Sequence, residues 1–269
     1  GNMLTQSGYD TTSKDYPEID ITDKVSLKKA MAKAKPEIVV NCAAYTDVDD
    51  CETNIEKAFA VNAEGVKNIA EACKEIKAKL IHYSTDYIFD GKKSQPYNES
   101  DMPSPLSVYG QSKLKGENYI TGILKDYLII RTSWLFGKNG KNFVTTILKL
   151  GQEKKELKVV DDQIGSPTYT IDLIQATESL MGNMAQGIFN ITNTGLCSWY
   201  EFAGKILEFA NIKGVKILPI VSDELTLPAK RPKNSILDNA KFNSFTQFKM
   251  PQWEEALKRF LSQNLPACQ

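Results

Sequence analysis

Short apolar runs rich in β-branched residues alternate with longer segments of helical periodicity, and this alternation restricts the fold more than any other feature of the sequence. The runs lie at residues 37–42, 79–84, 127–131 and 157–160, with a weaker first candidate at residues 9–12. Such a pattern is typical of repeated strand–helix–strand units, which place their strands in one parallel sheet. We therefore predict an α/β fold with a Rossmann-like, doubly wound parallel sheet.

The helical segments between these runs have recognisable ends. Thr22 can cap a helix over residues 23–35, and Pro36 would stop that helix. A longer helix over residues 55–77 is expected to bend near Asn62. Further helices are predicted at residues 107–124 and 142–151.

The alternation loosens beyond about Pro167. We expect residues 1–140 to form a dinucleotide-binding domain and residues 141–269 to form mainly a smaller C-terminal α/β substrate lobe, with some segments returning to the first domain. Because ligands of doubly wound proteins bind at the carboxyl ends of the strands, catalytic residues should follow the strands. The later elements are predicted as a helix at 171–181, a strand at 188–192, a helix at 199–210, an extended segment at 215–221, a loop at 228–232 and a helix at 252–264.

The charge balance excludes two classes of partner. The chain has 33 Lys and Arg residues against 33 Asp and Glu residues, so its formal net charge is zero. It therefore lacks the positive field that a non-specific binder of nucleic acid or of acidic membranes needs. No apolar run approaches the roughly 20 residues of a membrane span, and the first residues lack the layout of a signal peptide. We expect a cytoplasmic protein that binds neither nucleic acid nor membrane.

Cysteine and histidine are too sparse for a metal site or a disulfide framework. The five cysteines, at positions 42, 51, 73, 197 and 268, lack close paired spacing, and His82 is the single imidazole. Reduced thiols and no metal are the better interpretation. His82 lies within an apolar run, which favours a structural role over that of a general base.

Tyr109 and Lys113 are the first residues that indicate a particular chemistry. They lie four residues apart in a helical segment, so both side chains occupy one helix face. A tyrosine with a pKa of about 10 gives up its proton at neutral pH only where its phenolate is stabilised, and a neighbouring ammonium does this. Such a pair can protonate a carbonyl oxygen while hydride reaches the carbon. The alternative is a solvated helix face without a catalytic role.

Hydroxyl groups and small side chains follow the neighbouring strands. Ser84 and Thr85 lie at the end of one strand candidate, where a third hydrogen-bond donor to a substrate oxygen belongs, and Ala43 and Ala44 follow the preceding strand. Small residues there let the backbone approach a flat cofactor, although close packing of helix and strand would also explain them. The ordered occurrence of these motifs after successive strands favours the catalytic interpretation.

With these motifs the chain resembles the dTDP-4-dehydrorhamnose reductases, a family of the extended short-chain dehydrogenases/reductases. The resemblance covers nearly the whole chain, and its later motifs are specific to the reductases. It implies reduction of dTDP-4-dehydro-6-deoxy-L-mannose to dTDP-L-rhamnose by hydride from NAD(P)H. The segments that carry it are residues 20–23, 41–49, 84–91, 104–117, 131–137, 161–168, 197–202 and 231–235.

The resemblance also implies roles for individual residues. Tyr109 would donate the proton to the 4-keto oxygen of the sugar, Lys113 would lower the pKa of Tyr109 and hold the nicotinamide ribose, and Thr85 would complete the triad. The aromatic ring of Trp134 suits a sugar face, although Trp134 could instead be a core residue. The guanidinium of Arg231 suits a diphosphate, although Arg231 could instead be a surface cation. The residues implied in binding are Asp20 and Ile21 at the adenine, Ala43, Ala44 and Tyr45 along the cofactor, and Thr85, Asp86, Trp134 and Arg231 at the dTDP-linked sugar.

One part of the superfamily pattern is absent from the sequence. A first strand followed by Gly-x-x-Gly-x-x-Gly holds the dinucleotide pyrophosphate, and the chain lacks it. Gly1 could be the last of these glycines, whereas Gly8 fits better as the end of a short helix before residues 9–12. We expect an N-terminal piece to precede this sequence, and we assign no pyrophosphate-binding residues. Asp10, followed by hydroxyls and Lys14, favours NADPH, with NADH as the alternative.

Two other functions compete with the reductase. A non-catalytic regulatory subunit of the same fold would explain the missing glycine loop, but intact Thr85, Tyr109 and Lys113 argue against it. An epimerase or dehydratase acting on another nucleotide sugar is the second, although a dehydratase needs added acid–base carboxylates and no glutamate accompanies Asp86. The sequence leaves open the configuration of the product at C4 and whether two copies of the chain pair as a homodimer.

Overall fold

The structure is a computed structural model that describes residues 2–264. Gly1 and Cys268, which enter the expectations above, lie outside the described residues. No helix in this part of the chain is long and apolar enough to cross a membrane.

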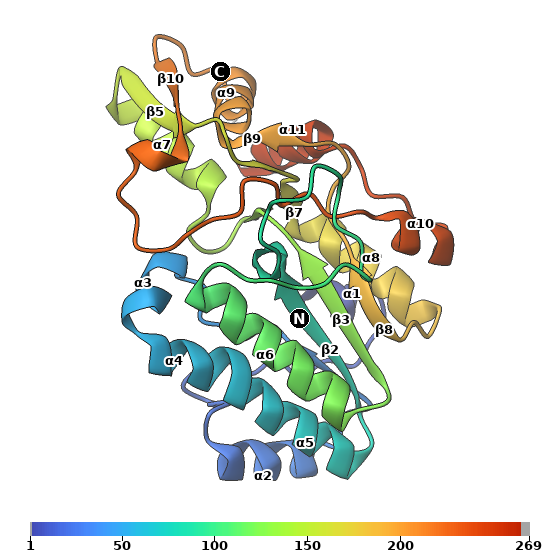
Figure 1. The fold of residues 1–269 in the computed structure, drawn as a ribbon. Coiled ribbons are helices and arrows are strands. Elements are labelled where there is room, and N and C mark those ends of the chain that lie inside the picture. The colour runs from blue at the N-terminus through green and yellow to red at the C-terminus, as the bar shows by residue number, and fades with distance from the viewer. Residues whose placement is uncertain (1, 265–269) are drawn as a thin grey trace.

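A four-stranded parallel sheet forms the centre of the lower part of the molecule in Figure 1. Its order is β1-β2-β3-β8, so the strand farthest along the chain returns to the edge opposite β1. Asn41 lies opposite His82 in the register of the first pair, and Thr85 lies opposite Thr132 in the next. The predicted parallel sheet is confirmed, except that the run at residues 157–160 lies outside it and pairs with residues 216–220 instead. The strands are β1 (Ile38–Asn41), β2 (Lys79–Thr85), β3 (Tyr127–Thr132) and β8 (Gly187–Asn190).

Helices cover both faces of this sheet because its side chains alternate between two apolar clusters. Leu80 and Ile129 pack on one face against α2, α5 and α6, whereas Ile81 and Leu128 pack on the other against α8 and α10. The doubly wound arrangement is therefore confirmed. The helices are α2 (Lys24–Ala34), α5 (Val66–Ile76), α6 (Val108–Ile123), α8 (Thr170–Gly182) and α10 (Ala240–Phe245).

The long helix expected over residues 55–77 contains a widened turn. It divides into α4 (Ile55–Phe59), the π-helical segment η1 (Ala60–Gly65) and α5. Asn62, where a bend was expected, lies inside η1 and is fully buried. Its side chain bonds both the backbone N–H and the carbonyl oxygen of Tyr45, at 2.8 and 2.9 Å. The π turn thus fixes the loop that follows β1.

Two predictions near the N-terminus are wrong. Residues 9–12 form no strand, because Tyr9 is the only large apolar residue among them and 37% of its surface stays exposed. The cap of α2 is Asp23 rather than Thr22, since the Asp23 carboxylate accepts the N–H groups of Val25 and Ser26 at 3.0 and 3.1 Å. Asp caps a helix as well as Thr does, so composition alone does not select the residue. Gly8 does close the short helix α1 (Asn2–Gln6), with φ +90°.

The upper part of the molecule has its own apolar core, built around Phe136, Phe202, Trp253 and Phe260. The parallel pair β5–β10 and the helices α7, α9 and α11 surround it. Its elements are β4 (Leu135–Phe136), α7 (Phe143–Glu153), β5 (Glu156–Val160), β6 (Ile164–Gly165), β7 (Thr168–Tyr169), β9 (Cys197–Ser198), α9 (Trp199–Phe209), β10 (Lys216–Ile220), η3 (Ser222–Glu224) and α11 (Trp253–Asn264).

Candidate active site

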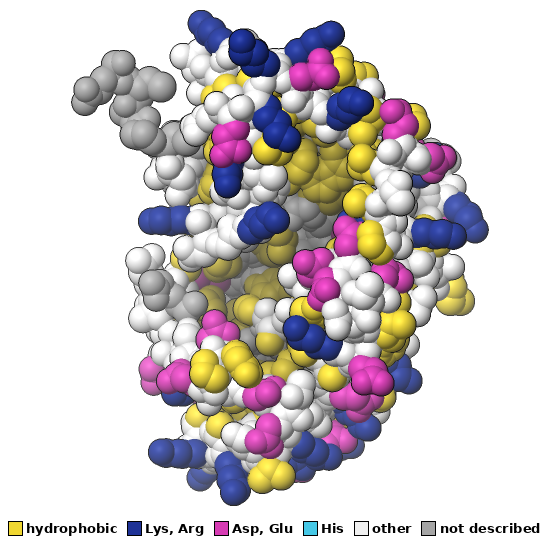
Figure 2. Space-filling view, turned by 90° about the vertical axis from the view of Figure 1, so that its left-hand side faces the viewer, with side chains coloured by type: hydrophobic (Ala, Val, Ile, Leu, Met, Phe, Trp, Pro, Cys, Tyr) yellow, Lys and Arg dark blue, Asp and Glu magenta, His cyan; other side chains and the backbone are white. Residues whose placement is uncertain are grey.

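The carboxyl ends of β1 and β2 and the start of α6 meet below the junction of the two parts. Short elements follow these strands, namely α3 (Val48–Thr53) after β1 and the 3-10 turn η2 (Asp86–Ile88) after β2. Figure 2, which views the left-hand side of Figure 1, shows this face hollowed at mid-height with hydrophobic side chains on the floor. This is where a doubly wound protein binds its ligand.

Thr85 and Asp86 end β2 in a buried polar turn. The Thr85 hydroxyl accepts the Tyr87 N–H at 3.2 Å and donates to the Asp86 carboxylate at 3.1 Å. Asp86 is only 2% exposed, and burial raises its pKa to about 6 although hydrogen bonds from Ser235 and Thr85 act in the opposite direction. Its Oδ2 atom and the hydroxyl of Ser84 have no hydrogen-bond partner within the described residues. These two buried polar atoms are therefore available to bond a ligand.

Tyr109 lies in the first turn of α6, and side chains on both flanks fix the start of this helix. Ser107 caps it through the Gly110 N–H at 3.2 Å, and Glu52 of α3 accepts the Val108 N–H at 2.8 Å. Burial raises the pKa of Tyr109, and a hydrogen bond with the side chain of Thr85 partly opposes this rise. The structure therefore brings Tyr109 and Thr85 together, as the strand-end argument predicts.

Lys113 lies one turn along α6 and is 2% exposed. Its ammonium donates to the Tyr83 carbonyl oxygen at 2.6 Å and lies 3.3 Å from the Nε2 atom of His82. Burial lowers the pKa of Lys113 to about 8, while Glu117 acts in the opposite direction. Glu117 is itself paired with Arg131 at 2.7 and 3.1 Å, so both of its carboxylate oxygens are already bonded.

The loop after β1 carries the residues expected along the cofactor. Ala43 is exposed, and Ala44 and Tyr45 are half-buried. The Ala43 N–H donates to the side-chain oxygen Oδ1 of Asn41 at 3.0 Å. The Tyr45 N–H donates to the side-chain oxygen of Asn62 at 2.8 Å. The loop is therefore fixed at both ends, and Ala43 within it stays exposed.

Asp20 and Ile21 lie on the chain that leads into α2. The Asp20 carboxylate accepts both the N–H and the hydroxyl of Thr22, at 2.8 and 2.7 Å. Ile21 packs so closely against Gly65 that a Cβ there would lie 2.7 Å from its side chain. Ile21 therefore lies against η1, the same turn that holds the loop after β1.

Trp134 follows β3 in a left-handed conformation, with φ +48°. Its ring stacks on Trp199 with centroids 3.5 Å apart and an interplanar angle of 8°. The ring also excludes any side chain at Gly165, where a Cβ would lie 2.5 Å from it. Trp134 is thus partly buried and held rigidly, between the core position and the open aromatic plate considered from the sequence.

Arg231 lies in the segment of residues 221–239 between β10 and α10, called the strap below. It ties the strap to the first part of the chain. Its guanidinium grips the Asp49 carboxylate with two nitrogens, at 3.1 and 2.6 Å, and donates to the Ala229 carbonyl oxygen at 3.0 Å. A hydrogen bond with Tyr87 adds to the causes that raise the pKa of Arg231. The residue is an anchored, half-buried cation at the edge of the site rather than a surface side chain.

Four polar residues that surround the site were assigned no part in it from the sequence. Ser235 reaches Asp86, Asn62 holds Tyr45, and Asn41 and His82 lie behind Lys113. Asn62 could have been found from the sequence, since a polar residue breaks the apolar periodicity of its helix. Ser235 lies in the 231–235 segment already singled out by the resemblance.

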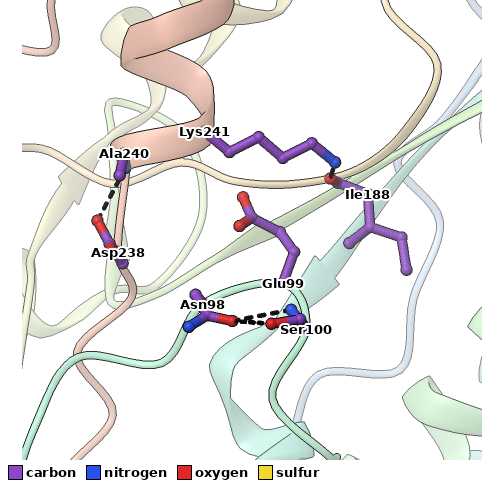
Figure 3. Close-up of a pocket in the computed structure, with 7 residues that line it drawn as sticks. All are labelled: Asn98, Glu99, Ser100, Ile188, Asp238, Ala240 and Lys241. Atoms are coloured by element: carbon purple, nitrogen blue, oxygen red, sulfur yellow. Dashed lines mark hydrogen bonds between the residues drawn. The ribbon is translucent and has the colours of Figure 1, made fainter.

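A second hollow lies at the outer edge of β8, away from Tyr109. Figure 3 shows hydrogen bonds among its lining residues: Lys241 donates to the Ile188 carbonyl oxygen, Asp238 accepts the Ala240 N–H, and Asn98 accepts from Ser100. The Glu99 carboxylate accepts the Asn190 N–H instead. Most polar groups that line the hollow therefore already have hydrogen-bond partners within the protein. Within residues 2–264 there is also no cluster of three or more His, Cys, Asp or Glu side chains suited to a metal, and Cys42, Cys51, Cys73 and Cys197 are free thiols.

A doubly wound parallel sheet, a tyrosine and a lysine one helical turn apart, and a hydroxyl at the end of the adjacent strand together define a short-chain dehydrogenase/reductase. Comparison with known proteins narrows this class. The chain belongs to the family described as the RmlD substrate binding domain, whose model matches residues 2–265.

Full-length relatives agree with this assignment. The dTDP-4-dehydrorhamnose reductase of Aggregatibacter actinomycetemcomitans is 40% identical over 269 residues, covering 95% of this chain and 91% of that protein. The spore coat polysaccharide biosynthesis protein SpsK of Bacillus subtilis is 41% identical, covering 99% and 93%. The crystal structure of dTDP-4-dehydrorhamnose reductase from Bacillus anthracis, in complex with NADP, superimposes with a TM-score of 0.94 at 40% identity, covering 98% of this chain and 95% of that one.

Proposed function

We propose that this chain reduces dTDP-4-dehydro-6-deoxy-L-mannose to dTDP-L-rhamnose with NADPH. The observation that carries the proposal is the pairing of Tyr109 with Thr85 at the carboxyl end of β2, with Lys113 one turn along α6 and bonded to the Tyr83 carbonyl oxygen of the same strand. The names of the full-length relatives support the sugar nucleotide as substrate, and the NADP in the Bacillus anthracis relative supports the choice of cofactor.

The residues present fit a nicotinamide cofactor. Ala43 offers a small, exposed side chain in the loop after β1, and the carboxylate of Glu117 is paired with Arg131 rather than with Lys113. We infer that Lys113 holds the nicotinamide ribose, that Ala43, Ala44 and Tyr45 line the cofactor, and that Asp20 and Ile21 flank its adenine. When bound, NADPH supplies the hydride that adds to the carbonyl carbon.

Tyr109 is the proposed proton donor. Its raised pKa keeps the phenol protonated at neutral pH, which is the form that a donor needs. The proton passes from the Tyr109 hydroxyl to the sugar O4 as hydride adds to C4, so the ketone becomes an alcohol and Tyr109 is left as a phenolate. The Lys113 ammonium and the Thr85 hydroxyl stabilise that phenolate, which offsets the cost of forming it in a buried site.

The proposed sugar site lies between Asp86, Trp134 and Arg231. The unpartnered Oδ2 atom of Asp86 can accept a sugar hydroxyl, and the Trp134–Trp199 stack provides a rigid apolar wall. Three of the five N–H donors of Arg231 are used by Asp49 and Ala229. Tyr87 takes a further hydrogen bond, and we infer that the one remaining donor holds the diphosphate of the substrate.

We infer a division of labour between the two parts of the chain. Residues 1–140 would bind the dinucleotide and residues 141–269 mainly the sugar nucleotide; α8 and β8 return to the parallel sheet. The four described free thiols support a reducing, cytoplasmic environment. Light scattering distinguishes the 30.0 kDa chain from the homodimer that the sequence left open.

The test is NADPH oxidation by the purified protein with dTDP-4-dehydro-6-deoxy-L-mannose, followed by identification of the sugar product. Matched reactions contain dTDP-glucose, which has no 4-keto group. We expect oxidation only with the keto sugar and a dTDP-rhamnose product. An epimerase would change the sugar without net loss of NADPH, and a non-catalytic subunit would leave both unchanged; either result contradicts the proposal.

A further inference from the structure

Lys113 has an unusual set of neighbours for a catalytic lysine. The side chains that face its ammonium are His82 of β2, Cys42 after β1 and Glu117 of α6, while Tyr109 precedes it on the same helix. Glu117 is committed to Arg131 through both carboxylate oxygens. The imidazole of His82 is therefore the nearest polar side chain that can respond to the charge of Lys113.

The imidazole of His82 connects Lys113 to Asn41. His82 has no exposed surface, and burial together with the charge of Lys113 lowers its pKa well below the ordinary value, so the ring stays neutral. Its Nδ1 atom lies 3.0 Å from Nδ2 of Asn41, and its Nε2 atom lies 3.3 Å from Nζ of Lys113. Asn41 and His82 are paired across β1 and β2, so the sheet itself fixes this contact.

The amide of Asn41 determines where the ring carries its hydrogen. Its Oδ1 atom accepts the Ala43 N–H at 3.0 Å, which turns Nδ2 toward the ring. Because Nδ2 only donates, Nδ1 of His82 must accept, and the hydrogen of the neutral ring then lies on Nε2, facing Lys113. A neutral amine can accept this hydrogen, but an ammonium has no lone pair and is repelled.

A second arrangement suits the charged lysine. If the Asn41 amide turns over, its oxygen accepts from Nδ1 of His82, and the bare Nε2 atom accepts from the ammonium. This arrangement loses the bond from the Ala43 N–H, in the loop proposed to line the cofactor. Each protonation state of Lys113 is thus matched to one tautomer of His82 and one orientation of Asn41.

We propose that His82 and Asn41 are positioning residues that set the proton balance of Lys113 and link it to the loop at Ala43. The inference rests on the proposed reductase function, because it concerns the lysine of that reaction. It assigns His82 a role beyond the structural one expected from the sequence. Neither residue contacts the reacting atoms; both act through Lys113.

The tautomer can be observed directly because His82 is the only histidine in the chain. We would record ¹⁵N NMR spectra of the ligand-free protein, labelled at histidine and carrying no histidine tag, between about pH 6 and about pH 10. We expect a neutral ring throughout, with its hydrogen on Nε2 at high pH and on Nδ1 once Lys113 takes up its proton at pH of about 8. A single tautomer over the whole range, or an imidazolium forming near the ordinary histidine pKa, would overturn the inference.

The variant Asn41→Asp tests the same link through activity. A carboxylate can accept from both Ala43 and Nδ1 of His82, so it holds the ring in the tautomer that accepts from the ammonium. We expect the alkaline limb of the pH profile of kcat/KM to move up by about one pH unit. The control is Asn118→Asp, on the exposed face of α6, the helix that carries Lys113. It adds the same charge and should leave the alkaline limb of the profile in place.

A structural role alone would change the melting temperature of Asn41→Asp without moving the limb, and that result contradicts the inference. The NMR measurement needs no substrate. A tautomer change in a protein that reduces no sugar would therefore contradict the proposed function alone, whereas a fixed tautomer in an active enzyme would contradict this inference alone.

Discussion

The Cα atom of Gly110 lies against the carbonyl oxygen of Tyr87, so that a Cβ at Gly110 would come within 2.2 Å of that oxygen. This approach presses the first turn of α6 onto the turn that follows β2. Tyr109 and Thr85, which precede Gly110 and Tyr87 along the chain, are brought together by the same contact. The geometry of the proposed triad therefore depends on the absence of one side chain.

Gly110→Ala should separate these two elements. The backbone carbonyl of Tyr87 cannot give way as a flexible side chain would, so we expect loss of most reductase activity and a lower melting temperature. Gly122→Ala is the matched control on the same helix, because a Cβ there meets no atom within 4 Å. The control should retain activity and gain up to about 1 kcal/mol of stability from helix propensity. Equal behaviour of the two variants would show that the close contact is not required.

Asp86→Asn should make the protein more stable at neutral pH and lower its reductase activity. Burial raises the pKa of Asp86 to about 6 from 3.8, so the folded state holds its proton more tightly than the unfolded state. The free energy of unfolding contributed by this group is therefore largest below about pH 4, falls as pH rises from about 4 to about 6, and stays low above that. Removing the charge should stabilise the protein at neutral pH by about 1–3 kcal/mol.

The comparison is made by denaturant unfolding of both proteins at about pH 7.5 and at about pH 4. The stability gain of Asp86→Asn should be present at neutral pH and vanish in acid. Reductase activity should fall, because the proposed acceptor for a sugar hydroxyl is lost. A variant equally destabilised at both pH values would contradict the assignment of a buried, charged Asp86.

Trp199→Leu should loosen Trp134. The stacked pair contributes about 0.5–1.5 kcal/mol beyond its burial, so we expect the KM for the sugar nucleotide to rise about two- to tenfold. The Kd for NADPH, measured by fluorescence titration, should stay within about twofold, because neither ring belongs to the proposed cofactor site. If the Kd for NADPH rose as much as the KM, that result would contradict the proposal that the tryptophan pair belongs to the sugar site.

The sequence predicted the parts of the structure that depend on local pattern. The apolar runs around Ile38, Leu80 and Leu128 are the strands of the sheet, and the four-residue spacing of Tyr109 and Lys113 lies on one helix, as expected. These features follow from periodicity, which each segment carries by itself.

Features that depend on contacts between distant segments could not be predicted in the same way. The pairing of Arg231 with Asp49 joins positions 182 residues apart, and Ser235 reaches Asp86 from the same distant strap. The role of His82 depends on the register of β1 against β2, which places Asn41 beside it. The polar run at residues 9–12 has too little apolar surface to form a strand. The pattern of alternating elements does not show how much apolar surface each run can bury.

Tyr109→Phe tests the central claim most directly. The change removes one hydroxyl from a buried ring and leaves its packing against Tyr87 in place. We would measure kcat for reduction of dTDP-4-dehydro-6-deoxy-L-mannose and, on the same protein, the Kd for NADPH. The account predicts that kcat falls by about 10²–10⁴-fold while the Kd for NADPH changes by less than about threefold. A variant that turned over at the wild-type rate would contradict the assignment of Tyr109 as the proton donor.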